Sequence, residues 1–224
     1  MTTPAADSDD VADLRVRPPL QRRTREAWHR ILDAGVALLE HGGYDAFTIA
    51  AVCERANVAP RAIYDRVDDK ESLFLAVYEH GIARLRAEYH VFADDERWRD
   101  LSTHQLVEDA VHEVAAIFTR HAAFLRAVVL ISGAHSEVRR RGARYSQDLG
   151  DRFTQLLLRA RDDLAHPDAE TAIRHIFTTT FSTLVVRTAY GPAFATEATD
   201  DQTFLAMLVD VAQRYLLHQC DDHY

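Results

Sequence analysis

The stretch TIAAVCERANVAPRAIYDRVDDKESLF, residues 48–74, has the pattern of two short helices joined by a sharp turn. Thr48 can cap the first of them, because its hydroxyl can accept a hydrogen bond from a free amide of the first turn. We expect this helix to end at Asn57, since asparagine tolerates positive φ. Pro60 then suits the first turn of the next helix, where its missing amide costs nothing. The stretch therefore predicts a helix-turn-helix.

The second short helix is expected to have an inner and an outer face. Its apolar residues would face the protein, and its long polar residues would face outward. A recognition helix of this kind fits the major groove of DNA. On spacing alone, a purely structural corner between two helices is about as common. The inward residues are Ala62, Ile63 and Val67, and the outward residues are Arg61, Tyr64 and Arg66.

The segments on either side are also helical in pattern. Apolar residues recur every three or four positions from Arg22 to Glu40, and Gly42 or Gly43 would end that helix in a left-handed cap. After the motif, further helices are predicted at 73–89, 101–121, 136–164, 169–191 and 202–219. The segment 122–134 is apolar on all sides, which predicts deep burial. No alternation typical of strands is present, so the fold class is all-α.

Composition limits the kinds of protein that this chain could be. It has 224 residues, 47% of them hydrophobic, and a net charge of −9. The charge is unevenly spread: residues 1–13 carry −4, residues 14–70 carry +2 and residues 71–224 carry −7. This asymmetry is typical of a local contact with a polyanion, but a random scatter of arginines explains it as well. No apolar run is long enough for a membrane helix, and two cysteines make no disulfide framework. We expect a soluble cytoplasmic protein that does not bind a membrane.

The sequence FTIAAVCERANVAPRAIYDRVDDKESLFLAVYEH, with the upstream TREAWHRILDAGVALLEHGGYDAFT, resembles the DNA-binding region of the tetracycline-repressor (TetR) family. The resemblance covers about residues 20–80. It implies a regulator, more often a repressor than an activator, that binds double-stranded DNA and a small-molecule effector. It also implies three parts: an N-terminal arm (1–19) expected to be disordered, a three-helix helix-turn-helix domain (20–68), and a helical ligand-binding and dimerisation bundle (69–224).

The resemblance also assigns roles to single residues. Thr48 would contact a phosphate at the start of its helix, and Lys70, the only lysine in the chain, would reach a second phosphate. The alternative for Lys70 is simple charge balance with neighbouring aspartates. The groove or its rim would be contacted by Pro60, Arg61, Tyr64 and Arg66, and the basic arm that includes Arg22 and Arg23 could follow the backbone or be a plain leader.

The sequence departs from the family pattern in the recognition helix. Ala59 stands where a Ser or Thr commonly caps this helix, and Val67 replaces a usual phenylalanine. Asp65 places a negative charge near the DNA, and Arg66 takes a position often filled by histidine. Asp65 could accept a hydrogen bond from cytosine or orient a neighbouring arginine. These differences affect the expected base specificity more than the expected fold.

Effector-binding residues are harder to assign from the sequence. Aromatic and polar residues of the second part could line an apolar cavity, although such residues more often belong to a plain core. The main candidates are Trp98, Phe118, His121, Phe124, Phe177 and Phe181, and Phe153, Thr179 and Arg126 are further possible lining residues. His104, Glu108 and His112 have a spacing that could hold a metal at two of the three positions, but a solvated polar stripe is the simpler explanation, so we expect no metal and no cofactor. The arginines 139–141 and 144 are expected on an exposed helix face.

The last two predicted helices carry wide apolar stripes that could pair across a two-fold axis. One stripe includes Ile173, Ile176, Phe177, Thr180 and Leu184, and the other includes Leu205, Leu208, Val209, Ala212 and Leu216. A homodimer suits a single helix-turn-helix, because two recognition helices match a palindromic site. A monomer that buries both stripes internally is the alternative. The competing functional hypotheses are a helical enzyme and a helical adaptor. The enzyme would have to act without any of the common catalytic motifs, because the chain has none of them.

Overall fold

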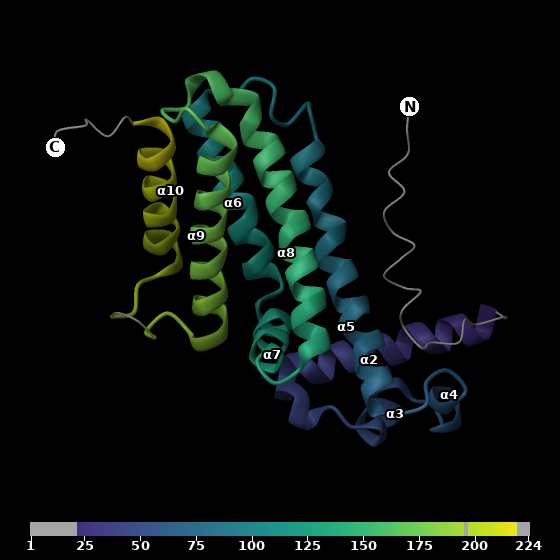
Figure 1. Cartoon of the computed structure of the whole chain (residues 1–224). Coiled ribbons are helices and arrows are strands. Elements are labelled where there is room, and N and C mark those ends of the chain that lie inside the picture. The colour runs from purple at the N-terminus through teal and green to yellow at the C-terminus, as the bar shows by residue number, and fades with distance from the viewer. Residues whose placement is uncertain (1–21, 195–196, 219–224) are drawn as a thin grey trace. The chain divides into compact units, whose positions relative to one another are not determined.

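The computed structural model describes residues 22–194 and 197–218, and within these ranges every regular element is helical (Figure 1). The predicted all-α fold is therefore confirmed. The predicted arm at 1–19 lies outside the described residues. In chain order the elements are α2 (Arg22–Ala46), α3 (Ile49–Ala56), α4 (Arg61–Tyr64), α5 (Lys70–Arg86), the 3₁₀ segment η1 (Ala87–Ala93), α6 (Thr103–Arg120), α7 (Ala122–Ser132), α8 (Ser136–Leu157), the 3₁₀ segment η2 (Leu158–Asp163), α9 (Ala169–Tyr190) and α10 (Asp201–Leu217).

The chain divides into two compact units, one ending at Arg84 and one beginning at Leu85. The boundary falls inside α5, later in the chain than the expected boundary between residues 68 and 69. Most of α5 therefore completes the helix-turn-helix unit, because Leu73, Phe74 and Val77 on this helix are fully buried. Each unit has its own core.

In the N-terminal unit, α2 packs along α3 and contacts α4. The predicted left-handed glycine cap is only partly present: Gly43 has the positive φ (63°), but its ψ of −157° is not left-handed helical, and it interrupts the helix without ending it. One further turn follows, so α2 ends at Ala46 rather than at Glu40. The reversal brings Phe47 into the core, where its side chain is fully buried beside Phe74.

A single glycine lets α2 approach α5 closely. A Cβ atom added to Gly35 would lie 2.4 Å from Cγ2 of Val77 and 3.1 Å from Cε2 of Phe47. Val77 and Phe47 are both fully buried, so neither side chain has free space to move into. Gly35 thus fixes how closely the two longest helices of this unit pack.

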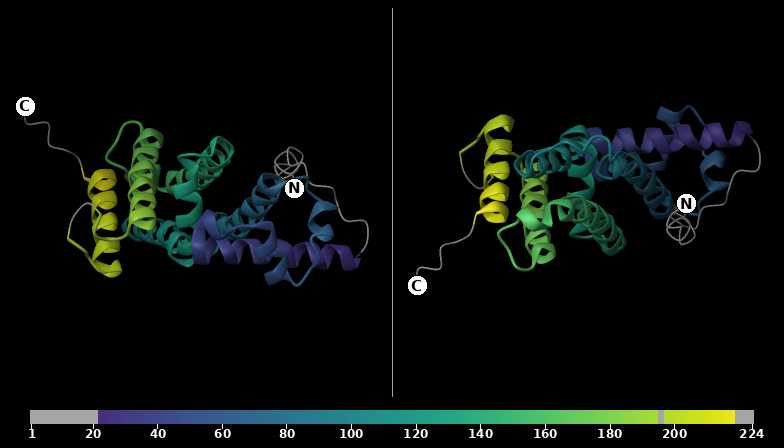
Figure 2. Two further views of the ribbon diagram at one scale, coloured as in Figure 1. Left: turned by 90° about the horizontal axis from the view of Figure 1, so that it is seen from below. Right: turned by 90° about the horizontal axis from the view of Figure 1, so that it is seen from above.

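The C-terminal unit is built from α6 to α10. α6 begins with a capping box in which Ser102 and Gln105 satisfy each other's backbone amides. α9 packs on α7, α8 and α10, and α10 packs on α6. Figures 1 and 2 show α9 and α10 side by side in all three views. α9 and α10 carry exposed apolar residues, and together with α6 and α7 they line a cavity.

Two expectations for this unit were wrong in detail. The predicted helix at 136–164 ends at Leu157, and a 3₁₀ segment with a break at Ala160 (φ −104°) follows. The apolar segment at 122–134 is buried on one face only. Phe124 and Val128 on α7 lie in the core, whereas the side chain of Leu130 is 48% exposed.

The prediction that the arginines of α8 are exposed is wrong for one of them. Arg141 is only 1% exposed, and its Nε lies 2.5 Å from Oε1 of Glu137 one turn earlier. Arg140 forms a second ion pair with the same carboxylate, at 2.7 Å. These two hydrogen bonds outweigh the burial of Glu137 and lower the pKa of its carboxyl. A charged residue is therefore part of the core of this unit.

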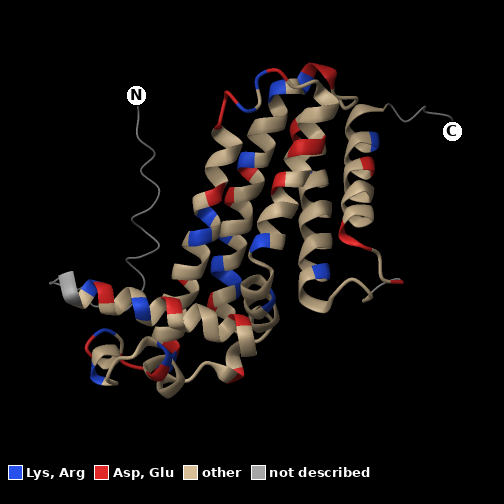
Figure 3. Ribbon diagram, turned by 180° about the vertical axis from the view of Figure 1, so that it is seen from behind, with Lys and Arg blue, Asp and Glu red and all other residues tan. Residues whose placement is uncertain are grey.

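Over the described parts of the chain, no single helix is long and apolar enough to cross a membrane; α6 and α7 reach that length and hydropathy only together, across an 83° bend. Within residues 22–194 and 197–218, no group of three or more potential metal ligands gathers, so His104, Glu108 and His112 on α6 do not form one. In Figure 3, acidic and basic residues are scattered over the helices of the C-terminal unit, and most of each ribbon is uncharged.

Candidate DNA-binding interface

The first helix of the motif begins as the sequence predicts. Thr48 is extended (φ −123°, ψ 153°), and its Oγ1 accepts a hydrogen bond of 3.1 Å from the amide of Ala51. The residue is exposed. Thr48 therefore provides a hydrogen-bond acceptor for one amide of the first turn of α3. The other free amides of that turn can donate hydrogen bonds to an anion such as a phosphate.

The turn between α3 and α4 is made by Asn57, the only residue other than glycine with positive φ among those described (φ 52°, ψ 57°). Its amide donates to the carbonyl of Glu54 at 3.2 Å, and the amide of Val58 donates to the carbonyl of Cys53 at 3.0 Å. These two bonds satisfy the last carbonyls of α3 and reverse the chain sharply. The predicted end of α3 and the predicted left-handed turn are confirmed.

α4 is short but firmly anchored. It begins after Pro60, which has helical φ and no side-chain cap, in agreement with an alanine at position 59. Helical turns continue past the end of α4, because the amide of Val67 donates to the carbonyl of Ile63 at 3.0 Å. Both of these side chains are fully buried. The predicted inward face is therefore confirmed for Ile63 and Val67.

The opposite face of α4 is open. The side chain of Arg61 is 89% exposed and that of Tyr64 is 49% exposed. Nε of Arg61 lies 3.9 Å from Oδ1 of Asp65, which is also exposed. An exposed pair at this distance contributes at most about 1 kcal/mol, so it does not prevent Arg61 from turning toward a base or a phosphate.

Arg66 differs from its prediction. It was expected on the outer face, but it is only 6% exposed. The amide of Arg66 donates to the carbonyl of Ile63 at 2.8 Å, and the amide of Val67 donates to the same carbonyl at 3.0 Å. Residues three and four positions apart lie on one side of a helical turn, so Arg66 shares the buried side of Ile63 and Val67. The outward prediction followed the charge of the side chain and not its position in the turn.

Lys70 is the first residue of α5, and a tyrosine holds its side chain in place. Its Nζ lies 4.1 Å from the ring centroid of Tyr44, a cation-π contact. Oδ1 of Asp69 accepts a hydrogen bond of 2.7 Å from the amide of Ser72 and so caps the same helix. Lys70 therefore carries its charge at the capped start of α5, and Asp69 already has a structural task there.

Tyr44 is a site residue that the sequence did not reveal. Its ring stacks 6.4 Å from that of Phe47 and lies edge-on to Phe74 at 4.9 Å, between centroids. Burial, followed by the charge of Glu71, raises the pKa of its hydroxyl. Because Phe47 directly precedes the cap of α3, this aromatic cluster joins the starts of α3 and α5. The only signal in the sequence is an aromatic residue directly after a pair of glycines.

Two other predicted DNA contacts remain predictions. Arg22 and Arg23 begin α2, and the structure describes their backbone but not their side chains. The rest of the basic arm lies outside the described residues.

The six candidate effector residues do not gather in one site. Trp98 is a core residue, since its Nε1 donates to the carbonyl of Val91 at 2.6 Å and its ring stacks on Phe92. Phe124 is buried as well. Phe177 and Phe181 line a groove of about 500 Å³ between α8 and α9.

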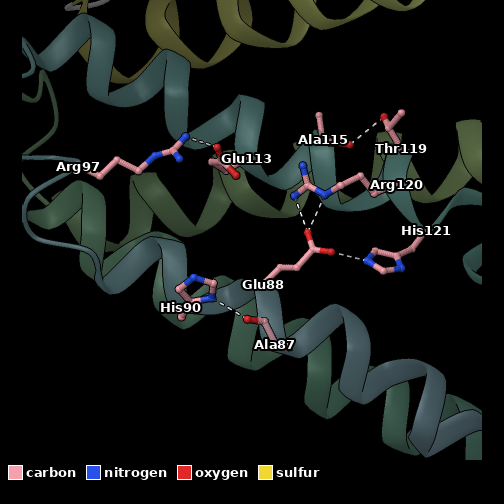
Figure 4. Close-up of polar contacts among 9 residues, drawn as sticks. All are labelled: Ala87, Glu88, His90, Arg97, Glu113, Ala115, Thr119, Arg120 and His121. Carbon is pink, nitrogen blue, oxygen red and sulfur yellow. Dashed lines mark hydrogen bonds and ion pairs between the residues drawn. The ribbon is translucent and has the colours of Figure 1, made fainter.

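His121 belongs to a polar cluster instead. Its Nε2 lies 2.6 Å from Oε1 of Glu88, and Arg120 pairs with the other oxygen of that carboxylate (Figure 4). The cluster holds the junction of α6 and α7 against η1. Of the six candidates, Phe118 alone lines the larger cavity, of about 540 Å³, between α6, α7, α9 and α10.

The predicted pairing stripes on α9 and α10 are largely used within the chain. Ile173, Ile176 and Leu184 on α9 are buried, as are Leu208 and Leu216 on α10. A different set of large apolar residues is exposed on these two helices and just after α9. These residues are Val186, Tyr190, Phe194, Met207, Val211 and Tyr215.

Comparisons with known proteins agree with this geometry. Residues 31–77 match the family described as bacterial regulatory proteins, tetR family. No curated protein matches the chain. The matched segment includes the helix-turn-helix and the first half of α5.

Solved structures resemble the chain over most of its length. One is assigned to the TetR-family transcriptional regulators and comes from Mesorhizobium loti (TM-score 0.65, 13% identity, 88% of this chain and 100% of that chain). Others are a TetR transcription regulator from Haloarcula marismortui (TM-score 0.61, 15% identity, 85% and 96%) and a regulatory protein in the tetR family from Rhodococcus RHA1 (TM-score 0.58, 20% identity, 88% and 99%). At these identities the likeness shows the fold, and the family match supplies the DNA-binding region.

Proposed function

We propose that the chain is a tetR-family regulatory protein rather than an enzyme, that it binds a palindromic DNA operator as a homodimer, and that it represses transcription until a small molecule binds. We place it in the cytoplasm, where bacterial DNA is found. The observation that carries the proposal is the outer face of α4. Arg61 and Tyr64 are exposed there, while Ile63 and Val67 hold the helix from behind.

The residues of this face suit different contacts with DNA. Arg61 is long enough to reach the floor of the major groove, where arginine pairs with guanine in a bidentate way. Tyr64 presents a ring and a hydroxyl, which suit the rim of the groove. Pro60, at the start of α4, has no amide to satisfy and so allows close approach of the helix to the backbone.

Two further groups fit phosphates on either side of the groove. The first turn of α3, capped by Thr48, offers free amides. Lys70 offers a point charge at the start of α5. Arg66 is not part of this set, because it is buried. Contacts of this kind fix the position of the recognition helix without reading the sequence.

Assembly would use the exposed apolar residues of α9 and α10. Met207, Val211 and Tyr215 lie one turn apart from each other along α10, and Tyr190 ends α9. Burial of such a face between two copies is favourable because it removes apolar surface from water. Two copies related by a two-fold axis would present two recognition helices to a palindromic site.

A small molecule would act by favouring a different arrangement of the dimer. A ligand shifts an equilibrium only by its difference in affinity between two states. Binding among α6 to α10 would change the separation of the paired recognition helices and lower the affinity for the operator.

The test is selection of duplexes from a random pool, followed by fluorescence anisotropy with the selected duplex. We expect a palindromic site, and we expect Arg61→Ala to weaken its binding by about 5- to 150-fold, the effect of losing one good base contact of about 1–3 kcal/mol. Arg139→Ala is the matched control, since Arg139 is also exposed but lies on α8 in the other unit. An equal loss in both variants, or selection of no duplex, would contradict the proposal.

A further inference from the structure

The cavity between α6, α7, α9 and α10 has the size of a small-molecule site. Its volume is about 540 Å³, which lies within the roughly 300–1,000 Å³ common for such sites. All the residues that line it belong to the C-terminal unit. The cavity can therefore be described from this unit alone.

Most of the wall is apolar. Phe118 on α6 and Leu184 on α9 are buried side chains, and Phe204 and Leu205 close the cavity from α10. Ala122 and Ala123 at the start of α7 are small and leave the space open. Such a wall favours an apolar ligand body, because both surfaces leave water on binding.

Three charged side chains line the cavity, and two of them compensate each other. Nη2 of Arg187 lies 2.7 Å from Oδ1 of Asp201 and donates to the carbonyl of Thr199 at 2.9 Å. Its guanidinium also lies 4.2 Å from the ring centroid of Phe204. Arg187 is thus held in the wall, with its charge balanced by Asp201.

The third charge, Arg126 on α7, is not balanced. This residue is exposed, and it makes no hydrogen bond or ion pair with any residue that the structure describes. The charged groups of the wall therefore sum to one positive charge, and that charge is on Arg126. A guanidinium recognises a carboxylate through two parallel hydrogen bonds.

We infer that this cavity binds a small apolar anion, of the type of a medium-chain or aromatic monocarboxylate, with its apolar body against Phe118, Leu184 and Phe204 and its carboxylate on Arg126. This inference deepens the proposed function, since it rests on the proposal that the C-terminal unit binds an effector. It assigns the class of that effector. Cations are disfavoured by the positive charge, and neutral apolar molecules lack the ion pair.

Isothermal calorimetry without DNA tests the inference with two pairs of probes. Each pair compares an acid with its neutral analogue: octanoate with 1-octanol, and 2-naphthoate with 2-naphthol. The wild-type protein should bind at least one acid more tightly than its alcohol. Arg126→Gln should weaken binding of that acid by about tenfold or more, the usual effect of losing a charge-assisted hydrogen bond, and should leave binding of the alcohol unchanged.

Two further variants distinguish binding in this cavity from a general effect of the surface charge. Arg139→Gln, on an exposed face of α8, should bind the acid as the wild type does. Ala123→Trp should fill the cavity and abolish binding of acid and alcohol alike, and because Ala123 is exposed at the rim, its thermal unfolding should change little.

Three results would overturn the inference: no binding of either acid at millimolar concentration, equal binding of acid and alcohol, or an unchanged affinity in Arg126→Gln. The proposed function fails in a different way. If the acid binds through Arg126 but leaves the anisotropy of bound operator unchanged, the inference stands and the effector role is refuted. If the protein binds no DNA duplex at all, the proposed function is refuted, and the calorimetry without DNA still tests whether the cavity binds an acid.

Discussion

Replacement of Gly35 by alanine tests how the helix-turn-helix unit is held together. The added Cβ would lie 2.4 Å from Cγ2 and 3.0 Å from Cγ1 of Val77, and 3.1 Å from Cε2 of Phe47. The optimum separation of two carbon atoms is about 3.5–4.0 Å. Because both neighbours are fully buried, the methyl group can enter only if α2 and α5 move apart.

The expected change in stability is the difference of two effects. Overpacking of a dense core typically costs about 1–3 kcal/mol, and a contact as short as 2.4 Å belongs at the upper end of that range. Alanine in a helix interior gains about 1 kcal/mol over glycine. We therefore expect Gly35→Ala to lower the free energy of unfolding of this unit by about 2 kcal/mol.

Tryptophan fluorescence in urea can follow this unit separately. Trp28 lies in the N-terminal unit and Trp98 in the C-terminal unit, and both are buried. In a Trp98→Phe background the fluorescence reports on Trp28 alone. The midpoint of this transition should fall in Gly35→Ala, and Gly35→Ala combined with Val77→Ala should lose less stability than the two single changes together, because the second change removes the methyl groups that clash.

Gly133→Ala provides the control. It is also a glycine with helical φ and ψ, at the end of α7, but an added Cβ would meet no atom within 4 Å. Gly133→Ala should leave the free energy of unfolding unchanged or raise it by up to about 1 kcal/mol. A gain in stability for Gly35→Ala similar to that of Gly133→Ala would refute the close packing of α2 on α5. Strictly additive effects of the changes at positions 35 and 77 would refute it as well.

Three other outcomes are expected. Lys70→Gln should weaken binding to operator and to random duplexes alike, and should reduce the slope of log K against log salt concentration by about one in anisotropy titrations. Met207→Glu should convert a dimer to a monomer in analytical ultracentrifugation, since it places a charge in the proposed apolar interface. Burial raises the pKa of Glu88, but hydrogen bonds from His121 and Arg120 outweigh burial and hold the pKa below the usual 4.5. The free energy of unfolding should therefore fall as the pH drops through this lowered pKa. In urea titrations at a series of pH values, Glu88→Gln should show a smaller fall of the unfolding midpoint over that acidic range.

The helix-turn-helix could be predicted from the sequence because local rules determine each of its boundaries. Thr48 caps α3 through its own side chain, and Asn57 adopts the left-handed conformation that the turn needs. Ile63 and Val67 are buried as the helical period requires. None of these features depends on a partner far away in the chain, so a single sequence was sufficient.

The effector candidates failed because a cavity depends on distant segments. Phe118 and Phe124 both lie on strongly apolar stretches, yet only Phe118 reaches the cavity between α6, α7, α9 and α10. Phe204 is an ordinary member of its helix in the sequence, and Arg126 was only one of several polar residues that could line a cavity. Their proximity follows from the packing of α7 and α10 against α6 and α9, which periodicity does not specify.

The two misplaced arginines have a common physical cause. Arg66 and Arg141 were expected in solvent because their charge makes burial costly. Arg141 is buried beside Glu137, one turn earlier on α8, and this i,i+4 pair was visible in the sequence. Arg66 follows the buried Ile63 by three residues and precedes the buried Val67, and this spacing places it on their side of the turn. Helical spacing therefore indicates both buried positions, and the charge of the two side chains was the misleading signal.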